Sequence, residues 1–255
     1  MNNGKELAAG DLLIANNNIY IPDETGFGNP KRVLNGMYFT VKDVLEKHSE
    51  TISIKAYPRP MFLSFTKISV KCLSLSGQDA EIWVLDNYLD CSDELTKEEQ
   101  IAVNVFINRR ITERKKSSPF AKTEFYSQLL SDADYQVLSN DEKEAIENII
   151  QNRSVQKEDR VPVKTTKVAR SLLKCYYDRY ESDIQRSSRE NDPLINVMYA
   201  KYAWAITVHK AVGSEFDNVI LKGFRTENDG ICNESYFRWL YSGLCVTAGG
   251  IFFST

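Results

Sequence analysis

Residues 202–221 read YAWAITVHKAVGSEFDNVIL, and this stretch decides the fold that we expect for the chain. Its first half predicts an apolar strand over Ala205 to Val208, which ends at a cluster of polar residues. Its second half predicts a buried strand over Val219 to Leu221, with Gly213 in the turn or early helix between the two. In open α/β sheets, ligands bind where such strands end. The stretch is therefore a candidate binding site.

The polar cluster carries three kinds of side chain that can contact phosphate oxygens: the hydroxyl of Thr207, the imidazole of His209 and the ammonium of Lys210. Glu215 can accept hydrogen bonds from a hydroxyl pair such as that of a ribose. Periodicity alone favours a plainer interpretation, in which His209 is a structural histidine and Lys210 a surface cation.

A second informative stretch lies near the C-terminus. Residues 238–244 read RWLYSGL and residues 250–254 read GIFFS, a pattern typical of a helix that leads into a strand. From Leu194 onward the chain alternates strand, helix, strand, helix, strand, which indicates an α/β arrangement.

Together these two stretches resemble the last two motifs of superfamily 1 DNA helicases of the UvrD-like and RecD-like branches. The penultimate family motif has the form A-x-T-x-H-K-x-x-G-x-E, and five positions match it in register. The resemblance implies that residues 191–255 are the C-terminal part of a second RecA-like domain. It also implies that Thr207, His209 and Lys210 contact single-stranded DNA, and that Gly213 and Glu215 contact the nucleotide.

The chain departs from the family pattern in two respects. The family arginine that reaches the γ-phosphate falls at Val246, and an arginine finger contributes about 10³–10⁵ in rate. Arg238 would be the nearest substitute. In addition, the sequence has no GxxxxGK[ST] loop to cradle phosphates and position magnesium. The resemblance therefore implies ATP and Mg as cofactors of an intact helicase and none for this chain alone. The implied partners are single-stranded DNA and a missing N-terminal RecA-like motor domain.

The N-terminal residues 1–92 predict β-structure, as a small barrel or curled sheet. Asn16-Asn17-Asn18 predicts a turn, and Asn35-Gly36 predicts a hairpin because both residues tolerate positive φ. Gly10-Asp11, the asparagine turn and Leu34-Asn35-Gly36 resemble the entry to the small β-barrel that RecD-like helicases insert in their second motor domain. The expected strands cover residues 12–15, 19–21, 32–34, 38–41, 52–55, 68–75 and 80–85.

Residues 93–190 predict a helical insertion for which we name no family counterpart. Capping boxes at Thr96–Glu99 and Ser139–Glu142 open two helices, and a third helix is expected over Thr166–Glu181. Residues 187–192 are polar and predict a connection. Five of the eight residues over Arg109–Lys116 are basic, which favours a solvated helix end; the alternative is a phosphate-contacting patch.

Composition limits the remaining possibilities. The chain is 42% hydrophobic with a net charge of −3, which indicates a folded protein without the overall basic charge of a dedicated nucleic-acid binder. No apolar run approaches the length of a spanning helix, so we expect a soluble, cytoplasmic protein without a membrane partner. Five scattered cysteines without a CxxC pair predict reduced, mostly buried thiols.

The expected fold is thus α/β: a second RecA-like helicase domain remnant with an inserted small β-barrel and a helical segment. The expected function is that of a non-autonomous, C-terminal part of an ATP-dependent DNA helicase. Two alternatives remain: a catalytically inactive, helicase-derived module that binds DNA or protein, and an unrelated α/β enzyme with a chance motif match.

Overall fold

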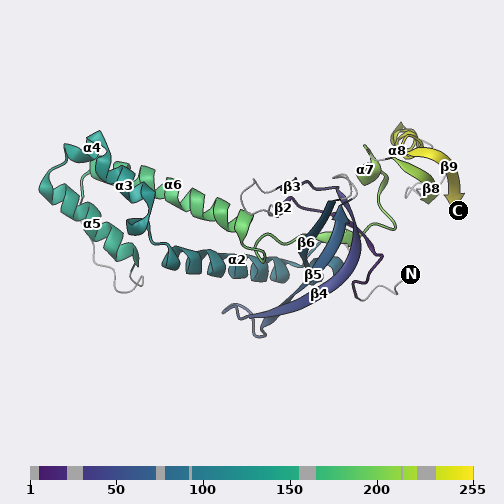
Figure 1. Ribbon diagram of the computed structural model, residues 1–255, viewed down its shortest axis with the longest axis horizontal. Helices are drawn as coiled ribbons and strands as arrows, with labels where there is room; N and C mark the ends of the chain where they lie inside the picture. Colours follow the sequence, from purple (N-terminus) through teal and green to yellow (C-terminus); the bar gives the residue numbers. More distant parts are fainter. Residues whose placement is uncertain are drawn as a thin grey trace.

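The computed structural model describes residues 6–21, 31–72, 78–91, 94–154, 165–213, 215–222 and 234–254. The chain forms a mixed α/β structure with three parts, which Figure 1 shows in a row. A curled antiparallel sheet lies in the middle, a long helical arm projects from one side of it, and a small C-terminal unit lies on the other side.

The sheet has five antiparallel strands in the order β6-β5-β4-β1-β7. Its first four strands in sequence confirm the β-structure predicted for the N-terminal residues. The last strand comes from the other end of the chain and pairs with β1, so the sheet joins the two ends of the sequence. The strands are β1 (Leu12–Ala15), β4 (Tyr38–Ile52), β5 (Met61–Cys72), β6 (Gln78–Leu85) and β7 (Ala200–Tyr202).

Two predicted turns, at the asparagine run and at Asn35-Gly36, have an unexpected role. The Asn-Gly pair does form a turn, with Gly36 at φ +92°, but the strands on either side of it do not pair with each other. Instead β2 (Ile19–Ile21) pairs with β3 (Lys31–Val33), while β1 pairs with β4. The hairpin predicted at Asn35-Gly36 is therefore wrong. Asn35 N donates to Asn18 Oδ1 at 2.9 Å, so both turns form one corner of a single long ribbon.

The sheet curls strongly along β4 and β5. Two register shifts, between Val41 and Asp43 and between Val44 and Glu46, interrupt the pairing of these strands, and such bulges increase the local twist. The curl brings β6 close to the segment before β7, where Val84 forms a bridge with Met198. In the described residues this single bridge does not make a closed barrel.

Fully buried aliphatic and aromatic side chains fill the concave side of the sheet. The cluster draws on strands from both ends of the chain, since Leu13, Phe39 and Ile68 pack with Met198 and Ala200. Each of these five is completely shielded from solvent. Burial on this scale makes the pairing of β7 with β1 a stable part of the fold.

The arm is built from helices that run out from the sheet and back, with α2 and α6 as its two long members (Figure 1). Both predicted capping boxes are present, at Thr96–Glu99 and at Ser139–Glu142. The helices after α1 (Asp86–Asp90) are α2 (Lys97–Ser117), the 3-10 turn η1 (Phe120–Lys122), α3 (Glu124–Ser131), α4 (Ala133–Gln136), α5 (Asn140–Ser154) and α6 (Lys167–Asn191).

Helix α6 is longer than its sequence pattern predicted. It continues ten residues past Glu181, through the polar stretch that we expected to be a connection. Ile184 and Ser188 are buried on this extension. The prediction failed because buried positions that are few and partly polar give no apolar periodicity.

The C-terminal unit contains α7 (Val208–Ala211), β8 (Phe216–Lys222), α8 (Glu234–Leu244) and β9 (Thr247–Ser254). Strands β8 and β9 are parallel, and the predicted order of strand, helix, strand, helix, strand from residue 194 onward is confirmed. The strand predicted over Ala205 to Val208 is wrong. The strand lies earlier, at β7, and Val208 begins α7, because the backbone hydrogen bonds of this region go to β1.

Two further expectations from composition can be compared with the structure. Among the described residues, none of the helices has the length and apolarity needed to cross a membrane. Cys72, Cys91, Cys175 and Cys245 are free thiols, but only the first is buried, so the expectation of mostly buried cysteines is wrong for this part of the chain. Cys232 lies outside the described residues.

Candidate functional site

Two of the predicted site residues, Thr207 and Lys210, line the same open cavity. It lies at the junction of the sheet and the C-terminal unit and has a volume of about 870 Å³. We call it the junction cavity. Its sheet side is formed by Asn16, Tyr88 and Lys201, among others. The cavity therefore combines side chains from the beginning, middle and end of the sequence.

The chain reaches the cavity through the pairing of β7 with β1. Ala200 lies opposite Ala15, and Ala203 N donates to the carbonyl of Leu12 at 2.8 Å. The chain then turns into α7, where the carbonyl of Thr207 accepts hydrogen bonds from the backbone of the next turn. The Thr207 side chain makes no capping hydrogen bond, so its hydroxyl is available to a ligand.

A chain of hydrogen bonds fixes the position of the Lys210 ammonium. Lys210 Nζ donates to Asn16 Oδ1 at 2.8 Å, and Asn16 Nδ2 donates to the hydroxyl of Tyr88 at 3.0 Å. The ring of Tyr88 stacks on that of Tyr199, with centroids 5.1 Å apart. Lys210 itself is exposed. Its charge thus points at solvent from a defined place, and among the described residues it is bound to a neutral partner and to no carboxylate.

Lys201 has a different role although it lines the same cavity. Its ammonium donates to the carbonyl of Tyr88 at 2.6 Å and to that of Cys91, and it lies 4.7 Å from the centre of the Tyr88 ring. These carbonyls are at the C-terminal end of α1, where a cation offsets the helix dipole. Lys201 therefore fastens α1 to β7 and adds positive charge to the cavity wall.

Tyr202, the last residue of β7, keeps its hydroxyl protonated and neutral. Burial raises the pKa of Tyr202, and the carboxylates of Asp11, Asp90 and Asp86 raise it further. The phenol is therefore protonated across the physiological range. Glu94 is the one acidic residue among those described as lining the cavity, against two lysines. The cavity thus offers hydroxyls, aromatic rings and two ammonium groups, whose positive charge is offset in part by the aspartates near Tyr202.

The other predicted site residues are not in the described lining of this cavity. Gly213 lies in the turn after α7 with φ +88°, a conformation that favours glycine. Glu215 is exposed and directly precedes β8. His209 belongs to α7, and its side chain lies outside the described part of the structure. The structure brings Thr207 and Lys210 together and places the proposed nucleotide residues farther along the chain.

The position of the family arginine is part of the hydrophobic interior. Val246 is 4% exposed, and its carbonyl accepts a hydrogen bond from Phe216 N at 2.9 Å. Arg238 is highly exposed on α8 and pairs with Glu234 at 2.5 Å. Arg238 is exposed to solvent, and the ion pair described for it is with Glu234 of the same helix.

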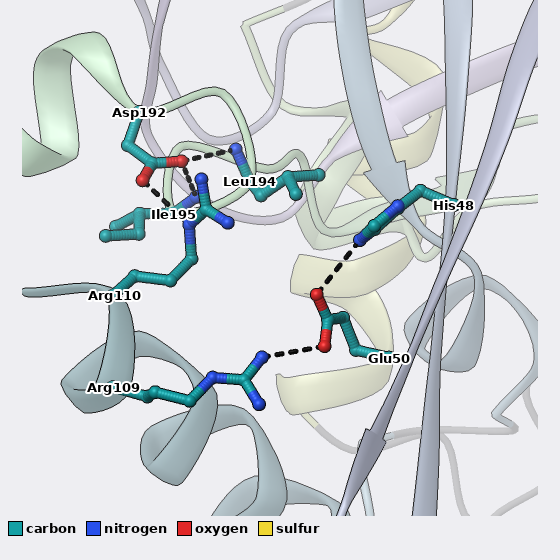
Figure 2. A network of polar contacts seen from close by, with 7 residues as sticks. All are labelled: His48, Glu50, Arg109, Arg110, Asp192, Leu194 and Ile195. Carbon is teal, nitrogen blue, oxygen red and sulfur yellow. Dashed lines mark hydrogen bonds and ion pairs between the residues drawn. The ribbon is translucent and has the colours of Figure 1, made fainter. Parts of the chain in front are cut away.

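The basic cluster over Arg109–Lys116 is largely structural, and Figure 2 shows why. Arg109 reaches across to Glu50 on β4 at 2.7 Å, while the next residue, Arg110, pairs with Asp192 at the end of α6, also at 2.7 Å. Asp192 in addition accepts the backbone N–H groups of Leu194 and Ile195 (Figure 2). Arg109 thus binds α2 to the sheet at β4, whereas Arg110 binds α2 to the end of α6 and so joins the two long helices of the arm.

The same cluster contains a third ion pair farther out. Lys115 Nζ lies 2.6 Å from Glu181 Oε1 and joins α2 to α6. Glu50 accepts a second hydrogen bond from His48. Although partial burial pushes the pKa of Glu50 up, the bonds from Arg109 and His48 lower it below the ordinary value. With three of its five cations bound to carboxylates, the cluster is better described as a set of braces than as a phosphate-contacting patch.

Comparison with known proteins gives no family: no protein-family model matches the chain, and no curated protein matches it. The functional argument therefore depends on the motif residues and on the cavity. Within the described residues, no group of three or more His, Cys, Asp or Glu side chains could hold a metal ion.

Sequence reasoning did not identify the sheet side of the cavity. Asn16 was interpreted only as a turn residue, and Tyr88 and Lys201 were not singled out. Lys201 had a signal, since it is a cation directly before the motif stretch. Asn16 had none, because its contact with Lys210 joins residues 194 positions apart.

Proposed function

We propose that this chain is the C-terminal, non-autonomous part of an ATP-dependent DNA helicase of superfamily 1. The observation that carries the proposal is the meeting of Thr207 and Lys210, two residues of the helicase-like motif, in one open cavity. In this proposal the junction cavity is a section of the single-stranded DNA track. Gly213 and Glu215 then contribute to the ATP cleft, and His209 to the DNA contacts.

The chemistry of the junction cavity suits a single strand of DNA. Lys210 supplies an ammonium for a backbone phosphate, and the hydroxyls of Thr207 and Tyr202 can bind the same group. An unpaired base can stack on an aromatic side chain whatever the sequence of the DNA. Tyr202 provides such a surface next to the two lysines, whereas the ring of Tyr88 already stacks on Tyr199 and lies under the Lys201 ammonium.

The C-terminal unit supports the proposal of a missing RecA-like motor domain as partner. Parallel sheets occur almost only with both faces covered. On the parallel pair β8–β9, Ile220 lies beside Phe252, and these side chains are 73% and 58% exposed. Leu221, whose side chain points to the opposite face, contacts α8 at Gly243 and is buried. The face of Leu221 is covered only in part, since Phe253 beside it is 64% exposed, and the other face is bare, as expected of part of a larger α/β domain.

The curled sheet takes the place of the small β-barrel in this proposal. Its five strands and the bridge from Val84 to Met198 are compatible with an insertion of the RecD-like kind. ATP and Mg belong to the intact helicase in the cytoplasm, and this chain alone binds neither productively.

A second function has a specific observation in its favour. Val246 occupies the place of the family arginine, and its side chain is buried where no charge could be accommodated without cost. This favours a catalytically inactive module derived from a helicase, which binds DNA or protein without an ATP cycle. Both proposals use the junction cavity, and they differ in whether a motor domain completes it.

The DNA contact can be tested with the variant Lys210→Ala and a labelled oligothymidylate. The logarithm of the binding constant should fall with the logarithm of the salt concentration. Loss of one phosphate contact to single-stranded DNA lowers that slope by about 0.7. Lys42→Ala is the matched control, because Lys42 is an exposed lysine already paired with Asp79. An equal slope for wild type and Lys210→Ala would remove the DNA role of the cavity.

The two candidate functions can be distinguished by the mass of the protein in the source cells. An antibody against this chain should detect a species much larger than 29.2 kDa if a motor domain is joined to it. Detection at 29.2 kDa, together with DNA binding that does not respond to ATP, would favour the inactive module.

A further inference from the structure

The hairpin formed by β4 and β5 has a charge pattern that differs from the rest of the chain. No Asp or Glu occurs from Thr51 to Gln78, although acidic residues outnumber basic ones in the chain, 35 to 32. The same stretch contains four cations, Lys55 and Arg59 in the connection between the strands and Lys67 and Lys71 on β5. A nucleic-acid contact leaves this kind of local basic segment within an acidic protein.

The end of this hairpin is held firmly. Ile52 and Leu63, near the ends of the two strands, are completely buried against α2, in a cluster that includes Phe106. The connection between the strands contains Pro58 and Pro60, which restrict its backbone. The backbone at the tip is therefore presented by a rigid support and loses little entropy on binding.

One aromatic side chain faces away from this support. Phe62 lies opposite Thr51 in the β4–β5 pairing, so these two residues share the face opposite the buried Leu63. Phe62 is 66% exposed, an unusual state for a phenylalanine on a well-packed strand. Ser49 and Ser64 form the next pair on the same face. The Ser64 hydroxyl already donates to Asp86 Oδ2 at 2.7 Å, so the hydroxyl beside the ring that can donate to a phosphate oxygen is that of Ser49.

Two cations of this stretch make no ion pair in the described part of the chain. Lys67 pairs with Glu81 at 2.7 Å, but neither Lys55 nor Arg59 has a described carboxylate within 4.0 Å. Three acidic side chains on adjoining elements make other contacts, and one of them, Asp86, lies against Ser64 next to the ring. Glu50 binds Arg109 and His48, Asp86 accepts from Ser64 and Thr66, and Glu99 caps α2 at Thr96.

We propose that Lys55, Arg59 and Phe62 form a second contact for single-stranded DNA, which we call the hairpin tip. The ring of Phe62 stacks on a base, while the two cations bind the phosphates on either side of it. The inference rests on the proposed function. It adds to that function a site far from the junction cavity, since Figure 1 places the end of the β4–β5 hairpin on the side of the sheet away from the C-terminal unit.

The proposal predicts the effect of three changes in the full chain on binding of a labelled oligothymidylate. Phe62→Ala should weaken binding by about 5- to 100-fold, the range for loss of one stacked base, and Phe62→Tyr should restore it. The double variant Lys55→Ala, Arg59→Ala should lower the salt slope by about 0.7 for each lost phosphate. Val137→Ala is the control for an exposed apolar side chain, because Val137 is 83% exposed on the arm.

The outcomes distinguish the hairpin tip from the junction cavity. Weaker binding with the tip variants and unchanged binding with Lys210→Ala would support the tip and overturn the DNA role of the cavity. The reverse result would overturn the tip alone. If wild type does not bind oligothymidylate at all, both proposals fail.

Discussion

The helical arm and the C-terminal unit differ in how completely each covers its own apolar surface. In the arm, Leu129 and Ile146 are fully shielded and Tyr180 is 2% exposed, and aromatic rings pack around them. In the C-terminal unit, the sheet face that carries Ile220 and Phe252 is open to solvent. The arm buries its apolar core within itself, whereas the C-terminal unit leaves Ile220, Phe252 and Phe253 exposed to solvent.

Electrostatic contacts show the same difference. The arm is braced by Arg109, Arg110 and Lys115, each bound to a carboxylate on another element. Burial raises the pKa of Tyr180 to about 12, and the hydroxyl of this tyrosine donates to the carbonyl of Ser118. In the C-terminal unit the described ion pair, between Arg238 and Glu234, lies within one helix and is exposed, so it adds little stability.

The largest expected effect comes from opening the finished core of the arm. Leu129→Ala should lower the free energy of unfolding by about 2–5 kcal/mol, because it leaves a cavity where a fully buried side chain was. The measurement is urea unfolding followed by circular dichroism. Ile220→Ala, the corresponding change on the bare sheet face, should stay within about 0.5 kcal/mol of wild type. Equal losses would mean that the C-terminal unit buries this face in solution. The two regions would then not differ in how completely they cover their apolar surface.

A smaller effect is expected inside the C-terminal unit, where β9 passes close to β8. A Cβ atom at Gly249 would lie 2.2 Å from the carbonyl oxygen of Asp217, so Gly249→Ala requires the strands to separate. We expect a cost of about 1–3 kcal/mol, confined to this unit. Hydrogen exchange of β8 and β9 peptides should increase, with no change in α2 or α6. Gly250→Ala should be milder, since its nearest neighbour is the side chain of Asn218. Slow exchange in both variants would contradict the close packing.

The smallest effect concerns the brace at the root of the arm. The pKa of Glu50 is lowered from 4.5 in the folded chain, so its charged form stabilises the fold above that value. This contribution is lost as the pH falls through the lowered folded-state pKa. Because Arg109 is 44% exposed, the loss should be under about 1 kcal/mol.

The check for this brace is thermal unfolding of Glu50→Gln at neutral pH and near pH 4. The variant should be less stable than wild type at neutral pH, and the difference should shrink in acid. Glu46→Gln, on the same strand and exposed, is the control. A difference that stays constant with pH would show that the brace acts through packing and not through charge.

Local signals in the sequence predicted local structure well. The capping boxes at Thr96 and Ser139 mark the starts of their helices because both partners lie within four residues of each other. The strands predicted over 12–15, 19–21, 32–34 and 80–85 and the alternation after residue 194 likewise agree with the structure. The strand predicted over 52–55 is wrong, because residues 53–60 connect β4 and β5, and these two strands are longer than the predicted 38–41 and 68–75. Elements with such short-range causes can be found without a structure.

Long-range pairing was not predictable in the same way. The turn at Asn35-Gly36 was placed correctly, but no local signal shows that its flanking strands pair with other partners. The motif stretch also looked like the end of an α/β strand, although β7 joins the antiparallel sheet of the N-terminal residues. As a result, Thr207 and Lys210 were proposed as site residues, while Asn16 and Tyr88, which complete the cavity around them, were not.

The bridge between Val84 and Met198 has an evolutionary consequence. The backbone leaves the sheet after β6 and returns beside it, with Leu85 N bonded to the carbonyl of Met198 at 3.1 Å. An insertion whose two ends are neighbours can be acquired, lengthened or lost without rebuilding its host. Related proteins should therefore keep the sheet and the roots of α2 and α6 while the outer arm varies in length, and a short loop joining those roots would give a minimal version of this architecture.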